Sequence, residues 1–212
     1  MGFPYLTIIV FLPVLGAIII GLLPHPRSRS IKLVAAGASL TSFVLSLALY
    51  AQFDRAPGTW LAESPLSWIP ALNASYHLGV DGLSLPLVVL TTFLGILAIL
   101  ISWKIELRTR EYFIWLLLLE TGILGVFTSL DLLLFFLFWE VELIPMYMLI
   151  TIWGSGRKEY SAIKFVVYTL FGSALMLAGI LALYFAAGTF DIMELSGMDL
   201  EGLRAAIPLT AI

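Results

Sequence analysis

Six long apolar segments separated by short polar segments dominate the pattern of hydrophobic and polar positions. A helix rises about 1.5 Å per residue, so about 20 apolar residues cross a hydrocarbon layer about 30 Å thick. The pattern therefore predicts an all-α fold, a polytopic transmembrane helix bundle with spans at 4–23, 31–50, 80–103, 112–130, 132–153 and 161–187. A seventh apolar segment starts near residue 205, close to the end of the chain, so we expect the N-terminal part of a longer subunit.

The composition agrees with a bilayer environment, because 61% of the 212 residues are hydrophobic and only 12% are charged. In soluble domains about 45–50% of the residues are apolar and about 25% are charged. The net charge of −3 and the lack of long basic runs exclude a nucleic-acid partner, which leaves lipids and other membrane proteins. The chain has no cysteine, and it has no dinucleotide, phosphate-loop or haem-attachment motif. We therefore expect no cofactor or metal in this chain, and any redox chemistry on other subunits.

The charges of the connecting segments predict the orientation in the membrane. Basic loops stay on the cytoplasmic side of a membrane. One set of loops carries only Arg55 and Arg204, whereas the other set carries eight basic residues: Arg27, Arg29, Lys32, Lys104, Arg108, Arg110, Arg157 and Lys158. The N-terminus is therefore expected on the non-cytoplasmic side, which is the lumen in a thylakoid.

Four charged residues lie away from the ends of the predicted spans: Glu120, Glu140, Glu142 and Lys164. A charge at the centre of a bilayer costs about 2.5–3.5 kcal/mol on insertion scales, so such residues mark functional sites by default. Glu120 lies ten positions before the turn at Leu130 and Glu140 ten positions after it, which puts both about 15 Å deep. Two carboxyls at equal depth could share a proton, or exchange one through water, because burial and repulsion favour the protonated form of at least one.

The other intramembrane residues have different expected positions. Glu142 points about 200° around the helix from Glu140, so one of the two should face the hairpin partner and the other a different helix. Lys164 should lie about 10 Å below the cytoplasmic surface and Glu140 about 25 Å below it, which disfavours direct pairing but permits a water-linked route. Pro145 frees a carbonyl near Val141, where a water could be held next to the proton path.

Each of these residues also has a structural alternative. The three glutamates could be hydrogen-bonded between helices, and Lys164 could reach the headgroup region. Asp81 and Asp131 stand just before apolar segments, which is typical of helix N-caps. His25 and His77 are interpreted as solvated loop residues rather than as metal ligands. The aromatic residues of the fourth and fifth segments are interpreted as packing and lipid-facing surface: Trp115, Phe135, Phe136, Phe138 and Trp139.

Three stretches of the sequence resemble one known family. They are SLDLLLFFLFWEVELIPMY at 129–147, followed by Trp153-Gly154, then YSAIKF at 160–165 with Tyr168-Thr169, and HLGVDGLS at 77–84. Together they resemble the antiporter-like subunits called NdhD, NuoM or chain 4 of the NAD(P)H–quinone oxidoreductases, the complex I family. The sequence at 140–145 and 160–162 is most similar to that of the cyanobacterial and plastid branch of the family.

The resemblance implies a proton-translocating subunit, a translocase that couples quinone reduction to proton transfer. It assigns the mid-membrane glutamate of the fifth helix to Glu140 and a second acidic position to Glu120. In the family, the fifth-helix glutamate pairs with a lysine of the seventh helix, a lysine that this sequence does not reach. Plastoquinone or another quinone and the iron–sulfur clusters would belong to other subunits, with ferredoxin as donor in the photosynthetic branch and the thylakoid as the membrane.

Two other hypotheses remain open at this stage. The chain could be part of a multisubunit cation/proton antiporter without redox coupling, although the fifth-helix sequence fits that class less well. It could also be a membrane scaffold whose buried charges merely pair with one another.

Overall fold

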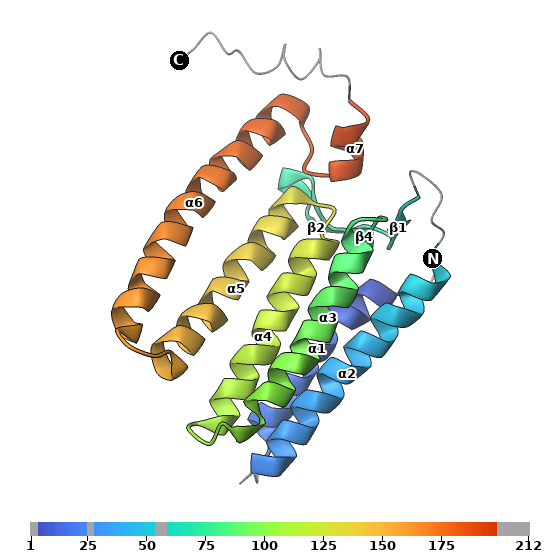
Figure 1. Cartoon of the computed structure of the whole chain (residues 1–212). Helices are drawn as coiled ribbons and strands as arrows, with labels where there is room; N and C mark the ends of the chain where they lie inside the picture. Colours follow the sequence, from blue (N-terminus) through green and yellow to red (C-terminus); the bar gives the residue numbers. More distant parts are fainter. Residues whose placement is uncertain (1–3, 25–27, 54–58, 199–212) are drawn as a thin grey trace.

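Six long helices of alternating direction form the molecule, which is described by a computed structural model over residues 4–24, 28–53 and 59–198 (Figure 1). Each is long and apolar enough to cross a membrane, which confirms the predicted fold class. The helices are α1 (Tyr5–Leu22), α2 (Ser28–Gln52), α3 (Ser84–Ile101), α4 (Thr109–Thr128), α5 (Leu132–Trp153) and α6 (Lys158–Ala187). The segment near residue 205 lies outside the described residues.

The bounds of most helices follow the apolar segments, and the third departs most clearly. Its apolar pattern begins at Val80, but the helix begins at Ser84 because Gly79–Val80 forms strand β4. At its other end α3 continues into a 3-10 turn, η2 (Ser102–Lys104). A short helix, α7 (Ile192–Ser196), follows α6 in a segment where the apolar pattern indicates no element.

Small strands between α2 and α3 cover one end of the bundle, and the sequence pattern did not predict them. Strand β1 (Leu61–Ala62) pairs with β4, and β2 (Leu66–Ile69) pairs with β3 (Ala74–Tyr76) through the 3-10 turn η1 (Pro70–Leu72), all antiparallel. Each strand has at most four residues, which is too short for the alternating pattern to be recognised.

The helices form a row with one helix behind it. In Figure 1, α3, α4, α5 and α6 follow one another, and α1 lies behind, packed on α2 and α4. Small residues let the backbones approach closely, as in other membrane bundles. A Cβ at Gly125 would lie 2.1 Å from the Phe138 ring, and one at Gly16 would lie 2.6 Å from the Ala38 Cβ. The glycines therefore determine how tightly α4 packs on α5 and α1 on α2.

Of the two aspartates predicted as helix N-caps, Asp131 occupies that position and Asp81 does not. The Asp131 carboxylate accepts hydrogen bonds from the backbone N–H groups of Leu133 (2.9 Å) and Leu134 (3.0 Å), which confirms it as the N-cap of α5. The N-cap of α3 is Leu83, so the N-cap prediction for Asp81 is wrong. Asp81 instead accepts hydrogen bonds from the N–H groups of Leu83 (3.2 Å) and Ser84 (2.7 Å) in the turn that leads into α3. Partial burial raises the pKa of Asp81, but these hydrogen bonds outweigh burial and lower it overall.

Basic side chains satisfy the carbonyl ends of the three helices that run toward the basic loops. The Lys32 Nζ donates to the Trp103 carbonyl at the end of η2 (2.6 Å), and the Lys158 Nζ donates to Ile152 near the end of α5 (2.7 Å). Arg110 donates to the carbonyl of Gly21 near the end of α1. Cations are favourable at helix C-termini, so these residues stabilise the bundle in addition to any role in orientation.

The interpretation of His77 as a solvated loop residue is wrong. Its side chain is buried, and its Nδ1 lies 2.6 Å from Oδ2 of Asp191, the N-cap of α7. The contact could not be expected from the sequence because it joins residues 114 positions apart. His25 lies outside the described residues.

Candidate functional site

Glu120 lies in the interior of the bundle, held between two neighbouring helices. It comes from the middle of α4 and is only 5% exposed. The Ser39 hydroxyl of α2 donates a hydrogen bond of 2.9 Å to its Oε1. On α3, Gly95 leaves room for the carboxyl: a Cβ there would lie 2.7 Å from both Cδ and Oε1 of Glu120. The sequence thus builds a slot for one carboxyl from a serine and a glycine on different helices.

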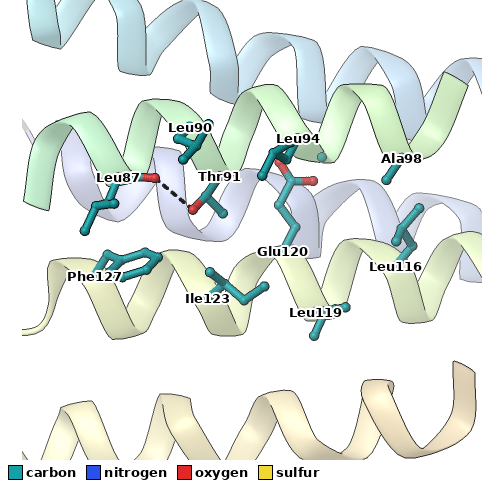
Figure 2. Close-up of a pocket in the computed structure, with 11 residues that line it drawn as sticks. Leu87, Leu90, Thr91, Leu94, Ala98, Leu116, Leu119, Glu120, Ile123 and Phe127 are labelled. Atoms are coloured by element: carbon teal, nitrogen blue, oxygen red, sulfur yellow. Dashed lines mark hydrogen bonds between the residues drawn. The ribbon is translucent and has the colours of Figure 1, made fainter. Parts of the chain in front are cut away.

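The same carboxyl lies at the wall of a groove between α3 and α4. Figure 2 shows Glu120 reaching from α4 toward α3, beside Leu94. The groove has a volume of about 370 Å³, and apart from Glu120 and Thr91 its lining is apolar: Leu87, Leu90, Leu94, Gly95, Ala98, Leu116, Leu119, Ile123 and Phe127. The Thr91 hydroxyl is bonded to the Leu87 carbonyl of its own helix (2.8 Å). Glu120 is therefore the acidic group that this groove presents.

Glu142 and Glu140 face opposite sides of α5, as their spacing predicts. A Cβ at Gly122 of α4 would lie 2.8 Å from the Cβ of Glu142, so Glu142 faces α4, the hairpin partner. Glu140 instead lines a pocket of about 560 Å³ between α5 and α6. The apolar and aromatic residues around it are Leu143, Ile144, Tyr147, Ile163, Val166, Val167 and Leu170.

One carboxylate oxygen of Glu140 is buried and, within the described part of the chain, has no hydrogen-bond partner. Oε1 accepts no hydrogen bond from any residue that the structure describes. Buried polar atoms are nearly always paired, and an unpaired one is costly. This oxygen is therefore available to a proton, a water molecule or a side chain that enters the pocket between α5 and α6.

The structure does not bring Glu120 and Glu140 together. Because Gly122 packs on Glu142 and Gly125 on Phe138, Glu120 lies level with Leu143 or Ile144, about 5 Å further from the turn than Glu140. The two carboxyls also face opposite sides of the α4–α5 pair. The prediction that these two carboxyls could share one proton directly is therefore wrong. Glu142 lies between them in the row of helices.

Lys164 lies outside the pocket that contains Glu140, whereas Pro145 lies on the same helix as Glu140. Lys164 is exposed on α6 and is not part of the pocket lining, and its Nζ lies 5.7 Å from the centre of the Tyr168 ring. It does not pair with Glu140, as the depth argument predicted. Pro145 is buried inside α5, which continues to Trp153. Its ring removes the N–H that would bond the Val141 carbonyl, next to both glutamates.

Ser39, Gly95 and Gly122 contact the acidic residues, and none of the three was predicted from the sequence. A signal existed for the serine, because Ser39, Ser42 and Ser46 recur at spacings of three and four and so lie on one face of α2. The glycines carry no such signal, since glycine is common in membrane helices. Within residues 4–24, 28–53 and 59–198, no three His, Cys, Asp or Glu residues form a group that could hold a metal ion.

Comparisons with known proteins agree with this fold. Residues 129–210 match the family model described as "NADH:quinone oxidoreductase/Mrp antiporter, TM". The chain is 45% identical to NADH-quinone oxidoreductase subunit M of Rhodobacter capsulatus and 40% identical to NAD(P)H-quinone oxidoreductase chain 4 1 of Synechococcus elongatus. These matches include 92% and 93% of this chain but only 38% of each relative, so the chain spans less than half the length of the curated relatives it matches.

Solved structures share the fold at low sequence identity. The archaeal membrane-bound sulfane sulfur reductase and the Mrp complex from Dietzia sp. each match with a TM-score of 0.77, at 20% and 19% identity. Respiratory complex I from Thermus thermophilus matches with a TM-score of 0.68 at 19% identity. Each match includes 95% of this chain but 32%, 22% and 41% of the respective solved chain.

The chain has the antiporter-like membrane fold that these solved complexes contain. The resemblance to the complex I family inferred from the sequence motifs is confirmed, and the chain is similar to subunit M and chain 4 of the NAD(P)H–quinone oxidoreductases.

Proposed function

We propose that this chain is a proton-translocating membrane subunit of an NAD(P)H- or ferredoxin-dependent quinone oxidoreductase. The observation that carries the proposal is Glu140, whose Oε1 is buried between two membrane-spanning helices without a partner among the residues that the structure describes. An acidic group in such a position costs free energy, and that cost is explained if the group binds and releases a proton during turnover.

The row of helices suggests how protons move through this part of the subunit. Glu120 faces α2 and α3, Glu142 lies between α4 and α5, and Glu140 faces α6. The three carboxyls therefore lie in order across the row of helices. We infer that protons pass laterally along this order by way of water or side-chain motion, and that the carbonyl freed by Pro145 helps to hydrate the segment next to Glu140.

The proposed cofactors and partner subunits are taken from the names of the relatives. In this proposal the chain acts within a translocase and performs no redox step. Plastoquinone or another quinone and the iron–sulfur clusters would belong to partner subunits, membrane and peripheral. The family's lysine on a seventh helix would enter the pocket between α5 and α6 and pair with the free oxygen of Glu140. The full-length chain is expected to contain that lysine.

The test is Glu140→Gln in the full-length subunit within its complex. We expect electron transfer to continue while the number of protons moved per electron falls, because glutamine keeps the shape of the side chain but cannot ionise. Glu111→Gln is a suitable control, since Glu111 is a surface residue in the first turn of α4, 3.4 Å from Arg108. An unchanged proton-to-electron ratio in the Glu140 variant would remove Glu140 from the mechanism.

A second candidate is a chain of a multisubunit cation/proton antiporter. The fold similarity to the Mrp complex supports it, and the matched family description includes both classes. Co-purification separates the two candidates: quinone-reducing partner subunits support the first, and sodium-dependent proton exchange without them supports the second. A scaffold with permanently paired charges would show no infrared protonation change of Glu140 during turnover.

We also propose that the N-terminus faces the non-cytoplasmic side and that the membrane is a thylakoid. Lys32, Arg110 and Lys158 lie together at the end of the bundle where α1, α3 and α5 end. Such a basic end supports this orientation, and the cyanobacterial relative supports the location. Because the chain has no cysteine, single cysteines can test the orientation. An impermeant thiol reagent should label Ser64→Cys and Ser155→Cys from opposite sides of the membrane, and cell fractionation tests the location.

A further inference from the structure

Glu120 has a neighbour that the comparisons do not assign to any role. Ser39 is fully buried in the middle of α2, and its hydroxyl donates to Glu120 Oε1 over 2.9 Å. The two residues are 81 positions apart in the sequence and come from different helices. The contact therefore depends on the packing of α2 against α4.

The serines on the same face of α2 make different contacts. Ser42 donates to the Ile9 carbonyl of α1 over 3.2 Å, and Ser46 contacts the Thr92 hydroxyl over 2.9 Å. All three serines are fully buried, so each supports packing between helices. Of these three, Ser39 is the one bonded to an ionisable side chain, which separates its contact from general polar packing.

Gly95 holds the Glu120 carboxyl from the other side. The absence of a Cβ at this position lets the carboxyl lie against the α3 backbone. The carboxyl is therefore held between the Ser39 hydroxyl and α3, with Oε1 directed toward α2.

We propose that Ser39 is a positioning residue for Glu120, and that it stays bonded to this carboxyl in both of its protonation states. A hydroxyl both donates and accepts. It donates to Oε1 of the carboxylate, and it accepts from the carboxylic acid when the proton resides on Oε1. In the second state the serine proton turns to a carbonyl of its own helix, as buried serines commonly do. Glu120 can then gain and lose a proton without leaving its place.

This inference rests on the proposed function, because it assumes that Glu120 takes part in proton transfer. The variants are Ser39→Ala, Ser39→Thr, Ser42→Ala and Glu120→Gln in the full-length subunit within its complex. Ser42→Ala is the matched control, since it removes one fully buried hydroxyl from the same face of α2 without contacting Glu120. The amount of assembled complex is measured for each variant, so that loss of assembly is not counted as loss of transport.

Three results are expected. Ser39→Ala lowers proton translocation per electron several-fold, whereas Ser42→Ala and Ser39→Thr leave it near the wild-type value. Adding Ser39→Ala to Glu120→Gln causes no further loss, because coupled residues are not additive. Infrared difference spectra show that the band of the protonated Glu120 carboxyl moves in Ser39→Ala and stays in Ser42→Ala.

The outcomes separate failure of the inference from failure of the proposed function. If Glu120→Gln has no effect on translocation, the proposed role of Glu120 is wrong. If Glu120→Gln impairs translocation but Ser39→Ala does not, or if Ser42→Ala impairs it as strongly, Ser39 contributes only to packing and the inference is overturned.

Discussion

Replacing Gly95 by alanine tests whether the slot for Glu120 has the shape described. The new Cβ would lie 2.7 Å from Glu120 Cδ and Oε1 and 2.9 Å from Oε2, closer than real contacts permit. Either α3 moves away from α4, or the carboxyl moves and weakens its hydrogen bond to Ser39. Overpacking costs about 1–3 kcal/mol, and loss of a hydrogen bond to a charged group costs about 1.5–3 kcal/mol.

The intrinsic effect of alanine in a helix has the opposite sign. Alanine is better than glycine by about 0.5–1 kcal/mol in a helix interior. The net prediction for Gly95→Ala is therefore a loss of about 0.5–2 kcal/mol in the free energy of unfolding. Gly37→Ala in α2 is the control, because a Cβ at Gly37 meets nothing within 4 Å. It should be neutral or stabilising.

The assay is denaturant-induced unfolding in detergent micelles, followed by helix content. The double variant Gly95→Ala with Glu120→Ala should recover most of the loss, because the truncated side chain no longer occupies the slot, and this non-additivity identifies the contact. If Gly95→Ala is as stable as Gly37→Ala, the carboxyl is not confined by α3, and the geometry described for Glu120 is refuted.

Two further predictions concern Asp131, the N-cap of α5, and Asp81, in the turn before α3. Asp131→Ala should lower the free energy of unfolding by about 2–3 kcal/mol, since its 1% exposed carboxylate accepts from the N–H groups of Leu133, Leu134 and Ser75; Asp131→Asn should retain most of that stability in the same unfolding assay, and an equal loss in both variants would contradict capping. For Asp81, the pKa in the folded state lies below the ordinary value of 3.8. The ionised carboxylate therefore stabilises the folded state above pH 3.8, and this stabilisation is lost as the pH falls through the folded-state pKa. The stability difference between the wild type and Asp81→Asn should therefore narrow below about pH 4, and a difference that widens on acidification would contradict this sign.

Much of the architecture could be predicted from the sequence because the bilayer imposes a simple constraint. A span needs about 20 apolar residues and satisfies its backbone hydrogen bonds within one helix, so local composition determines the helices. The Asp131 cap is equally local, since it acts within three residues. The opposite directions of Glu140 and Glu142 also followed from helical geometry alone.

Which groups meet across helices could not be predicted in the same way. The sequence placed Glu120 and Glu140 at the same depth, but only the packing of Gly122 on Glu142 and Gly125 on Phe138 decided their relative height and the sides they face. The Ser39 partner of Glu120 and the Asp191 partner of His77 join segments 81 and 114 positions apart. Contacts of this kind depend on the rotation and spacing of helices, which the hydrophobic pattern leaves open because nearly every face of a membrane helix is apolar. The sequence by itself thus determined the number of spans and the presence of buried acids, and the tertiary structure decided which neighbours those acids have.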